Sequence, residues 1–170
     1  QYDQAYFDRW YRDPEYAVID RTVLERRVHL AVSVTEYLLE RRVRRVLDVG
    51  CGEGVWRAIL KKIRPRVQYL GLDPSSYVVR RYGGRRHIRL GGLGDLGELG
   101  LKGRFDLIVC SDVIHDVSTA ELRSGLPPLA AMLTGVAFWE AFAREDEIEG
   151  DSEEFQDRSA ATYLKLCRAA

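Results

Sequence analysis

The nonapeptide Val46-Leu-Asp-Val-Gly-Cys-Gly-Glu-Gly54 joins an apolar run to three glycines at alternate positions. The amphipathic segment 55–63 follows at once. This order predicts a buried strand, a tight glycine turn and a helix. Glycine suits such a turn because it accepts a positive φ and lets a ligand approach the backbone. A ligand carboxylate fits there, because the first helical turn presents free N–H groups and a partial positive charge.

The glycine spacing separates two classes of cofactor site. Dinucleotide sites use G-x-G-x-x-G, but here the spacing is G-x-G-x-G, with Val55 in the place of the third glycine. This counts against a dehydrogenase. With Asp48 two residues before Gly50, the stretch resembles motif I of the class I S-adenosylmethionine (SAM) methyltransferases. The resemblance implies SAM as cofactor and S-adenosylhomocysteine (SAH) as product, with the cofactor's amino-acid end wrapped by the turn: Asp48, Gly50, Cys51, Gly52 and Gly54.

Strand and helix patterns alternate along the rest of the chain. Further strands are predicted at 67–72, 87–90, 105–110 and 135–142, with a glycine-rich loop at 91–103. Such alternation predicts an α/β fold with a doubly wound, mainly parallel sheet, whose ligands bind at the carboxyl ends of the strands. The resemblance implies one domain over 1–170, with a helical cap at 1–42 and the α/β core at 43–170. The family's C-terminal strand hairpin is expected to be missing from this chain.

The N-terminal cap is expected to hold two helices. Tyr2, Tyr6 and Trp10 share one face of the first helix. This helix is expected either to dock on the core or to form a lid over the cofactor. Tyr11 is a cofactor-binding candidate. A second helix is expected from Pro14 to about Arg41. Its predicted buried stripe contains Ile19, Val23, Leu30, Val34 and Leu38, widened by Leu24, Val28 and Ala31.

Three further helices have predicted boundaries. The helix after the second strand should stop at Gly83-Gly84. Ser118 and Glu121 form a capping-box pattern, and Gly125, Pro127 and Pro128 are expected to interrupt the helix that follows. Asp151 or Ser152 is expected to cap the last helix.

Two acids follow the second and third strands. Asp73, followed by Pro74, offers two acceptor oxygens for the vicinal hydroxyls of a ribose, although an N-cap role is the plainer alternative. Asp95 stands where the resembled family often has an acid that accepts from the adenine amino group. The backbone N–H of Leu96 would then read a ring nitrogen.

The segment 105–116 resembles motif IV of the same family. Cys110 and Ser111 would face the sulfonium, and Asp112 would lie between cofactor and acceptor. Methyl transfer expels a neutral thioether, so the leaving group needs no acid. In-line positioning of the reactants can lower the barrier by up to about 7–11 kcal/mol. A base adds about 10²–10⁴-fold to the rate only where the acceptor loses a proton. His115 is the candidate base, or else packs beneath the rim. Glu140 would bind the acceptor or orient His115.

Composition limits the partners. Net charge is +0, which gives no general attraction to nucleic acid or membrane, and no apolar run reaches a membrane span. Three scattered cysteines show no disulfide or metal spacing, so we expect a cytoplasmic setting and no metal.

The acceptor is expected to be a small molecule that is methylated at O or N, and the protein is expected to be a monomer or homodimer. The alternatives are an RNA or protein methyltransferase using basic segments 41–45 and 80–89, or a non-catalytic SAM-binding module. The acidic run 144–154 is a solvated loop or a gate for amines.

Overall fold

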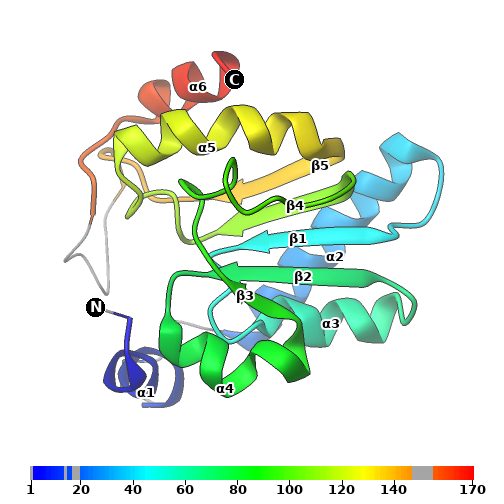
Figure 1. Ribbon diagram of the computed structural model, residues 1–170, viewed down its shortest axis with the longest axis horizontal. Coiled ribbons are helices and arrows are strands. Elements are labelled where there is room, and N and C mark those ends of the chain that lie inside the picture. Colours follow the sequence, from blue (N-terminus) through cyan, green and yellow to red (C-terminus); the bar gives the residue numbers. More distant parts are fainter. Residues whose placement is uncertain (1, 14, 17–19, 147–154) are drawn as a thin grey trace.

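The computed structural model describes residues 2–13, 15–16, 20–146 and 155–170. Five strands form one sheet in the order β3-β2-β1-β4-β5, and every neighbouring pair is parallel (Figure 1). The strands are β1 Arg45–Val49, β2 Gln68–Asp73, β3 Ile88–Leu90, β4 Phe105–Ser111 and β5 Leu133–Glu140. The helices are α1 Gln4–Arg12, α2 Arg21–Leu39, α3 Val55–Ile63, α4 Ser76–Arg86, α5 Thr119–Met132 and α6 Ala160–Arg168. The predicted α/β fold is confirmed.

The strand order places a topological switch point between β1 and β4. From β1 the chain winds outward through β2 to β3, and it then returns to β4 on the other side of β1. The turn after β1 and the loop after β4 therefore diverge at one edge of the sheet. Open α/β sheets bind their ligands in this crevice.

Two apolar cores lie on opposite faces of the sheet. Val46 and Leu107 face one core, with Leu24 and Val28 of α2 and Trp56 of α3. Their strand neighbours point the other way, since side chains alternate along a strand. That second core joins the sheet to α5 and the loop after β3, and contains Leu47, Val49, Ile108, Cys110, Leu93, Leu122 and Leu126.

The buried face of α2 differs from the predicted one. Leu24, Val28 and Ala31, expected only to widen the stripe, are buried, whereas Leu30 and Leu38 are about 60% exposed. Apolar residues occupy both faces of this helix, so their spacing alone could not select the buried one. Pro14 and Ile19 lie outside the described residues; α2 begins after Asp20, whose side chain accepts hydrogen bonds from the N–H groups of the first turn.

Glycine and proline interrupt no helix where a break was predicted. The helix α4 passes through Gly83, which is buried. There is little room for a side chain at this position, because a Cβ would lie 3.0 Å from the Ile88 carbonyl oxygen. The helix α5 is continuous through Pro127 and Pro128. The predicted capping box of Ser118 and Glu121 is present at its start.

The basic run at 41–45 has a structural role. Asp106 accepts two hydrogen bonds from the Arg41 guanidinium and two more from the backbone N–H groups of Arg44 and Arg45. Burial opposes ionisation of Asp106, but these donors hold its pKa below the usual value.

The last helix begins later than predicted. Ser159 caps α6 through its hydroxyl, which accepts from the Thr162 N–H. The expected caps, Asp151 and Ser152, and most of the acidic run lie outside the described residues. No helix in the part of the chain that the structure describes is long and apolar enough to cross a membrane.

Candidate active site

A cavity of about 290 Å³ opens at the carboxyl ends of β1 and β4. Its walls come from α1, the glycine turn, the end of β2, the loop after β3 and the loop after β4, with Glu121 from the first turn of α5. The residues that line it are Tyr2, Tyr6, Phe7, Tyr11, Val49, Gly50, Gly52, Asp73, Pro74, Gly92, Leu93, Asp95, Asp112, Val113, Asp116, Val117 and Glu121.

The glycine turn is held by the end of β2. Gly50, Gly52 and Gly54 adopt positive φ angles of 69°, 51° and 75°, a region that side chains rarely enter. The N–H of Gly50 donates to the Leu72 carbonyl at 2.8 Å, and the N–H of Gly52 donates to Asp73 Oδ2 at 2.7 Å. A Cβ on Gly52 would lie 2.4 Å from the Tyr11 hydroxyl. The turn therefore requires glycine for its backbone and for its close approach to α1.

Asp73 connects this turn to the start of α4. Its other oxygen, Oδ1, accepts from the Ser75 N–H at 2.9 Å. The carboxylate is 95% buried, and burial raises its pKa despite these two backbone donors. Each carboxylate oxygen has further acceptor capacity, so Asp73 can still accept hydrogen bonds from a ligand in the cavity.

Asp48 lies outside the cavity. On β1 it projects to the same side as Val46, toward α2 and α3, where its Oδ2 accepts from the Tyr69 hydroxyl at 2.7 Å. Burial raises its pKa to about 7, and the negative charge of Asp73 contributes, while the Tyr69 hydrogen bond opposes the rise. The structure therefore places Asp48 beneath the glycine turn.

Other predicted cofactor residues also lie behind the cavity lining. Cys51 packs against Gly71, where a Cβ would meet its Sγ at 2.6 Å, and burial raises the pKa of its thiol. Gly54 is the N-cap of α3, and Cys110 is fully buried in the core beside α5. The side chain of Leu96 is buried, and its N–H donates to the Leu93 carbonyl at 3.3 Å.

The helix α1 and Tyr2 just before it form one wall, in which two of the three residues of the predicted face take part. Tyr2, Tyr6, Phe7 and Tyr11 line the cavity, whereas Trp10 turns to pack on Tyr16, with ring centroids 6.2 Å apart. Phe7 is the buried anchor of the helix. Burial raises the pKa of Tyr11 well above its usual value, so its hydroxyl keeps its proton.

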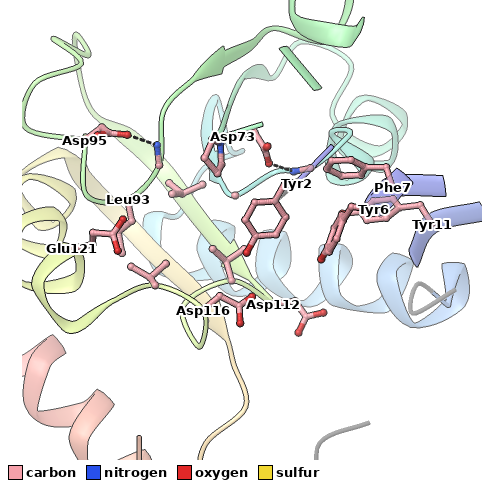
Figure 2. Close-up of a pocket in the computed structure, with 17 residues that line it drawn as sticks. Tyr2, Tyr6, Phe7, Tyr11, Asp73, Leu93, Asp95, Asp112, Asp116 and Glu121 are labelled. Atoms are coloured by element: carbon pink, nitrogen blue, oxygen red, sulfur yellow. Dashed lines mark hydrogen bonds between the residues drawn. The ribbon is translucent and has the colours of Figure 1, made fainter. Parts of the chain in front are cut away.

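Carboxylates dominate the polar part of the lining. Figure 2 shows Asp95 and Glu121 at the end of the cavity away from α1, with Asp112 and Asp116 on the loop after β4. Asp95 accepts from the Gly92 N–H at 2.8 Å, and Glu121 accepts from the Ser118 N–H at 3.0 Å. In the described part of the chain, no lysine or arginine lines the cavity.

His115 and Glu140 do not line the cavity. The His115 ring is buried beside Phe142 and Phe155, its Nδ1 accepts from the Phe142 N–H at 3.4 Å, and its Nε2 lies 3.7 Å from Asp116 Oδ2. Glu140 accepts from Ser111 Oγ at 3.0 Å and pairs with Arg27 of α2 at 2.7 Å. Asp112, the third catalytic candidate, does line the cavity and has a left-handed φ of 64°.

Sequence reasoning missed two of the lining acids. Asp116 follows β4, and Glu121 was interpreted only as half of a capping box. Their position after a strand that ends at the switch point was the available signal, because loops at that edge form ligand sites.

The cavity suits a positively charged adenosyl cofactor better than a dinucleotide. A tight glycine turn can approach the ligand, acids are available to accept its hydrogen bonds, and no cation among the described lining residues would neutralise a pyrophosphate. Fold and site together define the Rossmann-like class of SAM-binding domains.

A family model described as a methyltransferase domain matches residues 23–134, about two thirds of the chain. The chain therefore belongs to the methyltransferase domain family and is a SAM-dependent methyltransferase of the EC 2.1.1 type. No curated protein sequence matches it.

Solved structures share the fold at low identity. The plantazolicin methyltransferase BpumL in complex with SAH is 14% identical, with a TM-score of 0.66 over 94% of this chain and 70% of that chain. An S-adenosylmethionine-dependent methyltransferase from Clostridium acetobutylicum is 14% identical, with a TM-score of 0.66 over 96% and 84%. Human N-acetylserotonin methyltransferase in complex with SAM is 19% identical, with a TM-score of 0.61 over 87% and 46%.

Proposed function

We propose that the chain transfers the methyl group of SAM to nitrogen or oxygen of a small-molecule acceptor, and that an amine is the favoured acceptor. The observation that carries this proposal is the cavity lining, in which a glycine turn and five carboxylates are combined with aromatic rings. Carboxylates attract a cationic ligand and repel an anionic one, and the aromatic faces add cation–π attraction.

The lining residues form one group that would bind the cofactor and another that would bind the acceptor. The glycine turn at Gly50 and Gly52 would let the cofactor lie against the backbone, and the carboxylates of Asp73 and Asp95 would accept its hydrogen bonds, with Tyr11 packed over Gly52. Asp112 and Asp116 lie on the loop after β4, and they would hold the acceptor. SAM supplies an electrophilic methyl group whose leaving group is neutral, so the protein needs no acid for it.

The protein's own contribution is orientation and proton handling. Asp112 and Asp116 can orient an amine through charge-assisted hydrogen bonds and accept the proton that the methylated nitrogen loses. His115 is buried behind Asp116 and would act through it, and Glu140 would support the end of β4 through Ser111.

The test begins with calorimetric titration of SAM and SAH, with NAD as a control. We expect both sulfur ligands to bind and NAD not to bind, and Gly52→Arg to abolish binding because a side chain there clashes with Tyr11 in the cavity wall. Release of SAH would then be measured against a panel of amines, phenols and carboxylic acids. Turnover confined to the acids would contradict the amine proposal, and absence of SAM binding would contradict the cofactor assignment.

A further inference from the structure

Arg158 is the only buried residue of the described segment 155–170, with an exposed fraction of 6%. Arginine is rarely buried unless its guanidinium is fully engaged. This guanidinium donates from Nη1 to the Ile114 carbonyl at 3.0 Å and from Nη2 to the Val117 carbonyl. Its Nε donates to Thr119 Oγ1 at 3.2 Å. All three oxygens belong to the segment that joins β4 to the first turn of α5.

The carbonyls that Arg158 binds belong to the loop whose side chains face the cavity. Asp112, Val113, Asp116 and Val117, all from this loop, line it. Val113 also packs on the glycine turn, since a Cβ on Gly50 would lie 2.5 Å from its Cγ2. A continuous set of contacts thus runs from Arg158 through the loop to the turn.

Backbone hydrogen bonds bring the same segment to the loop. The N–H of Gln156 donates to the His115 carbonyl at 2.8 Å, and the N–H of Arg144 donates to the Arg158 carbonyl at 2.7 Å. The helix α6 that follows buries none of its own residues. Tyr163 and Leu166 of α6 pack against the core but stay partly exposed, so the fully buried contact of the described segment is the one that Arg158 makes to the cavity loop.

We propose that Arg158 is a positioning residue, which holds the 112–118 loop against the glycine turn and so sets the shape of the cavity on the acceptor side. The guanidinium suits this task because its planar fork can reach several oxygens in fixed directions, which a lysine ammonium cannot do. The effect on ligand binding rests on the proposed function, whereas the effect on the loop does not.

The experiment compares Arg158→Ala and Arg158→Lys with Arg144→Ala. Arg144 is the matched control because it lies in the same region and its guanidinium pairs with Asp157 in an exposed contact. Hydrogen exchange of the ligand-free protein would report on the amides of 112–118 and 50–54 separately. We expect faster exchange in 112–118 for both Arg158 variants, a smaller change in 50–54, and no change for Arg144→Ala.

Binding and chemical rescue give the second readout. The Kd of SAH should rise about 2- to 30-fold in Arg158→Ala, and guanidinium ion at concentrations far below denaturing should partly restore it, whereas equal sodium chloride should not. If Arg158→Ala does not fold, Arg158→Lys carries the exchange measurement. Unchanged loop exchange in the variant measured, or equal acceleration in both segments, would overturn the proposal. Altered loop exchange in a protein that never binds SAH would instead contradict the proposed function.

Discussion

The Asp48 carboxylate and the Tyr69 hydroxyl form a buried hydrogen bond of 2.7 Å beneath the glycine turn. Tyr69 also touches the turn from below, since a Cβ on Gly54 would lie 3.6 Å from its hydroxyl. The acid of the motif thus supports the turn through a partner on the neighbouring strand, 21 residues further along the chain.

Burial of the Asp48 carboxyl makes stability depend on pH, and the Tyr69 hydrogen bond only moderates the effect. The pKa of Asp48 is about 7 in the folded protein, against an ordinary value of 3.8, so the folded state keeps a proton that the unfolded state has lost between about pH 4 and pH 7. The free energy of unfolding should therefore fall as pH rises through this window, by on the order of 4 kcal/mol in total, and level off above it.

Asp48→Asn should remove most of this dependence, because the carboxamide imitates the protonated acid and still accepts from Tyr69. Urea denaturation at pH 5 and pH 8 would measure it. The raised pKa of Asp73 leaves a remaining slope of the same sign. A variant with the same pH slope as the parent protein would contradict the assignment.

Gly52→Ala should weaken SAH binding by two routes. The left-handed backbone at φ 51° costs a non-glycine residue about 1–2 kcal/mol, and the new Cβ would clash with the Tyr11 hydroxyl. Tyr11→Phe should therefore recover part of the affinity in the double variant, but only the part due to the clash. Gly84→Ala is the control, since its Cβ would meet nothing within 4 Å. Strict additivity of the two substitutions would show that Tyr11 does not press on the turn.

Asp73→Asn should lower the affinity for SAH. The Asp73 carboxylate accepts from two backbone N–H groups, one on each oxygen. In the asparagine variant the side-chain NH₂ group would face one of these N–H donors, which would then lose its acceptor. An unsatisfied buried group costs about 1–3 kcal/mol. We expect a Kd about 5- to 150-fold higher. Asp157→Asn, which changes an exposed acid, should bind as the parent does. Calorimetry under one buffer condition would compare the three proteins.

His115→Gln separates a base from a residue that acts through Asp116. A general base that touches the acceptor would be worth about 10²–10⁴-fold in kcat. Because the ring lies behind Asp116 and between two phenylalanines, we expect a loss of about tenfold or less, together with a lower melting temperature. The rate should be followed from pH 6 to pH 9 with the acceptor found in the panel. A much larger loss at unchanged stability would make His115 the base.

The sheet could be predicted from the sequence because buried parallel strands appear as short apolar runs between turn signals. The segment 105–110, for example, became β4 with one residue added at its end. The glycine spacing likewise requires particular backbone angles, which the structure has at Gly50, Gly52 and Gly54.

The direction in which side chains point was harder to predict from the sequence than the strands themselves. Placing Asp48 under the turn requires the identity of its partner on β2, and choosing between the two apolar faces of α2 requires the sheet against which it packs. The contact of Arg158 joins segments about 40 residues apart through backbone carbonyls, which leave no pattern in a sequence.

The wall formed by α1 also contains tryptic cleavage sites. Arg9 and Arg12 lie in the helix whose aromatic side chains line the cavity, and Arg12 is held by Glu53 next to the glycine turn and by Tyr82 of α4. A protease that cuts after arginine must detach this helix from the turn before it can act there. A ligand that fills the cavity should oppose that detachment, so we expect cleavage within the first twelve residues to slow as the cavity is occupied.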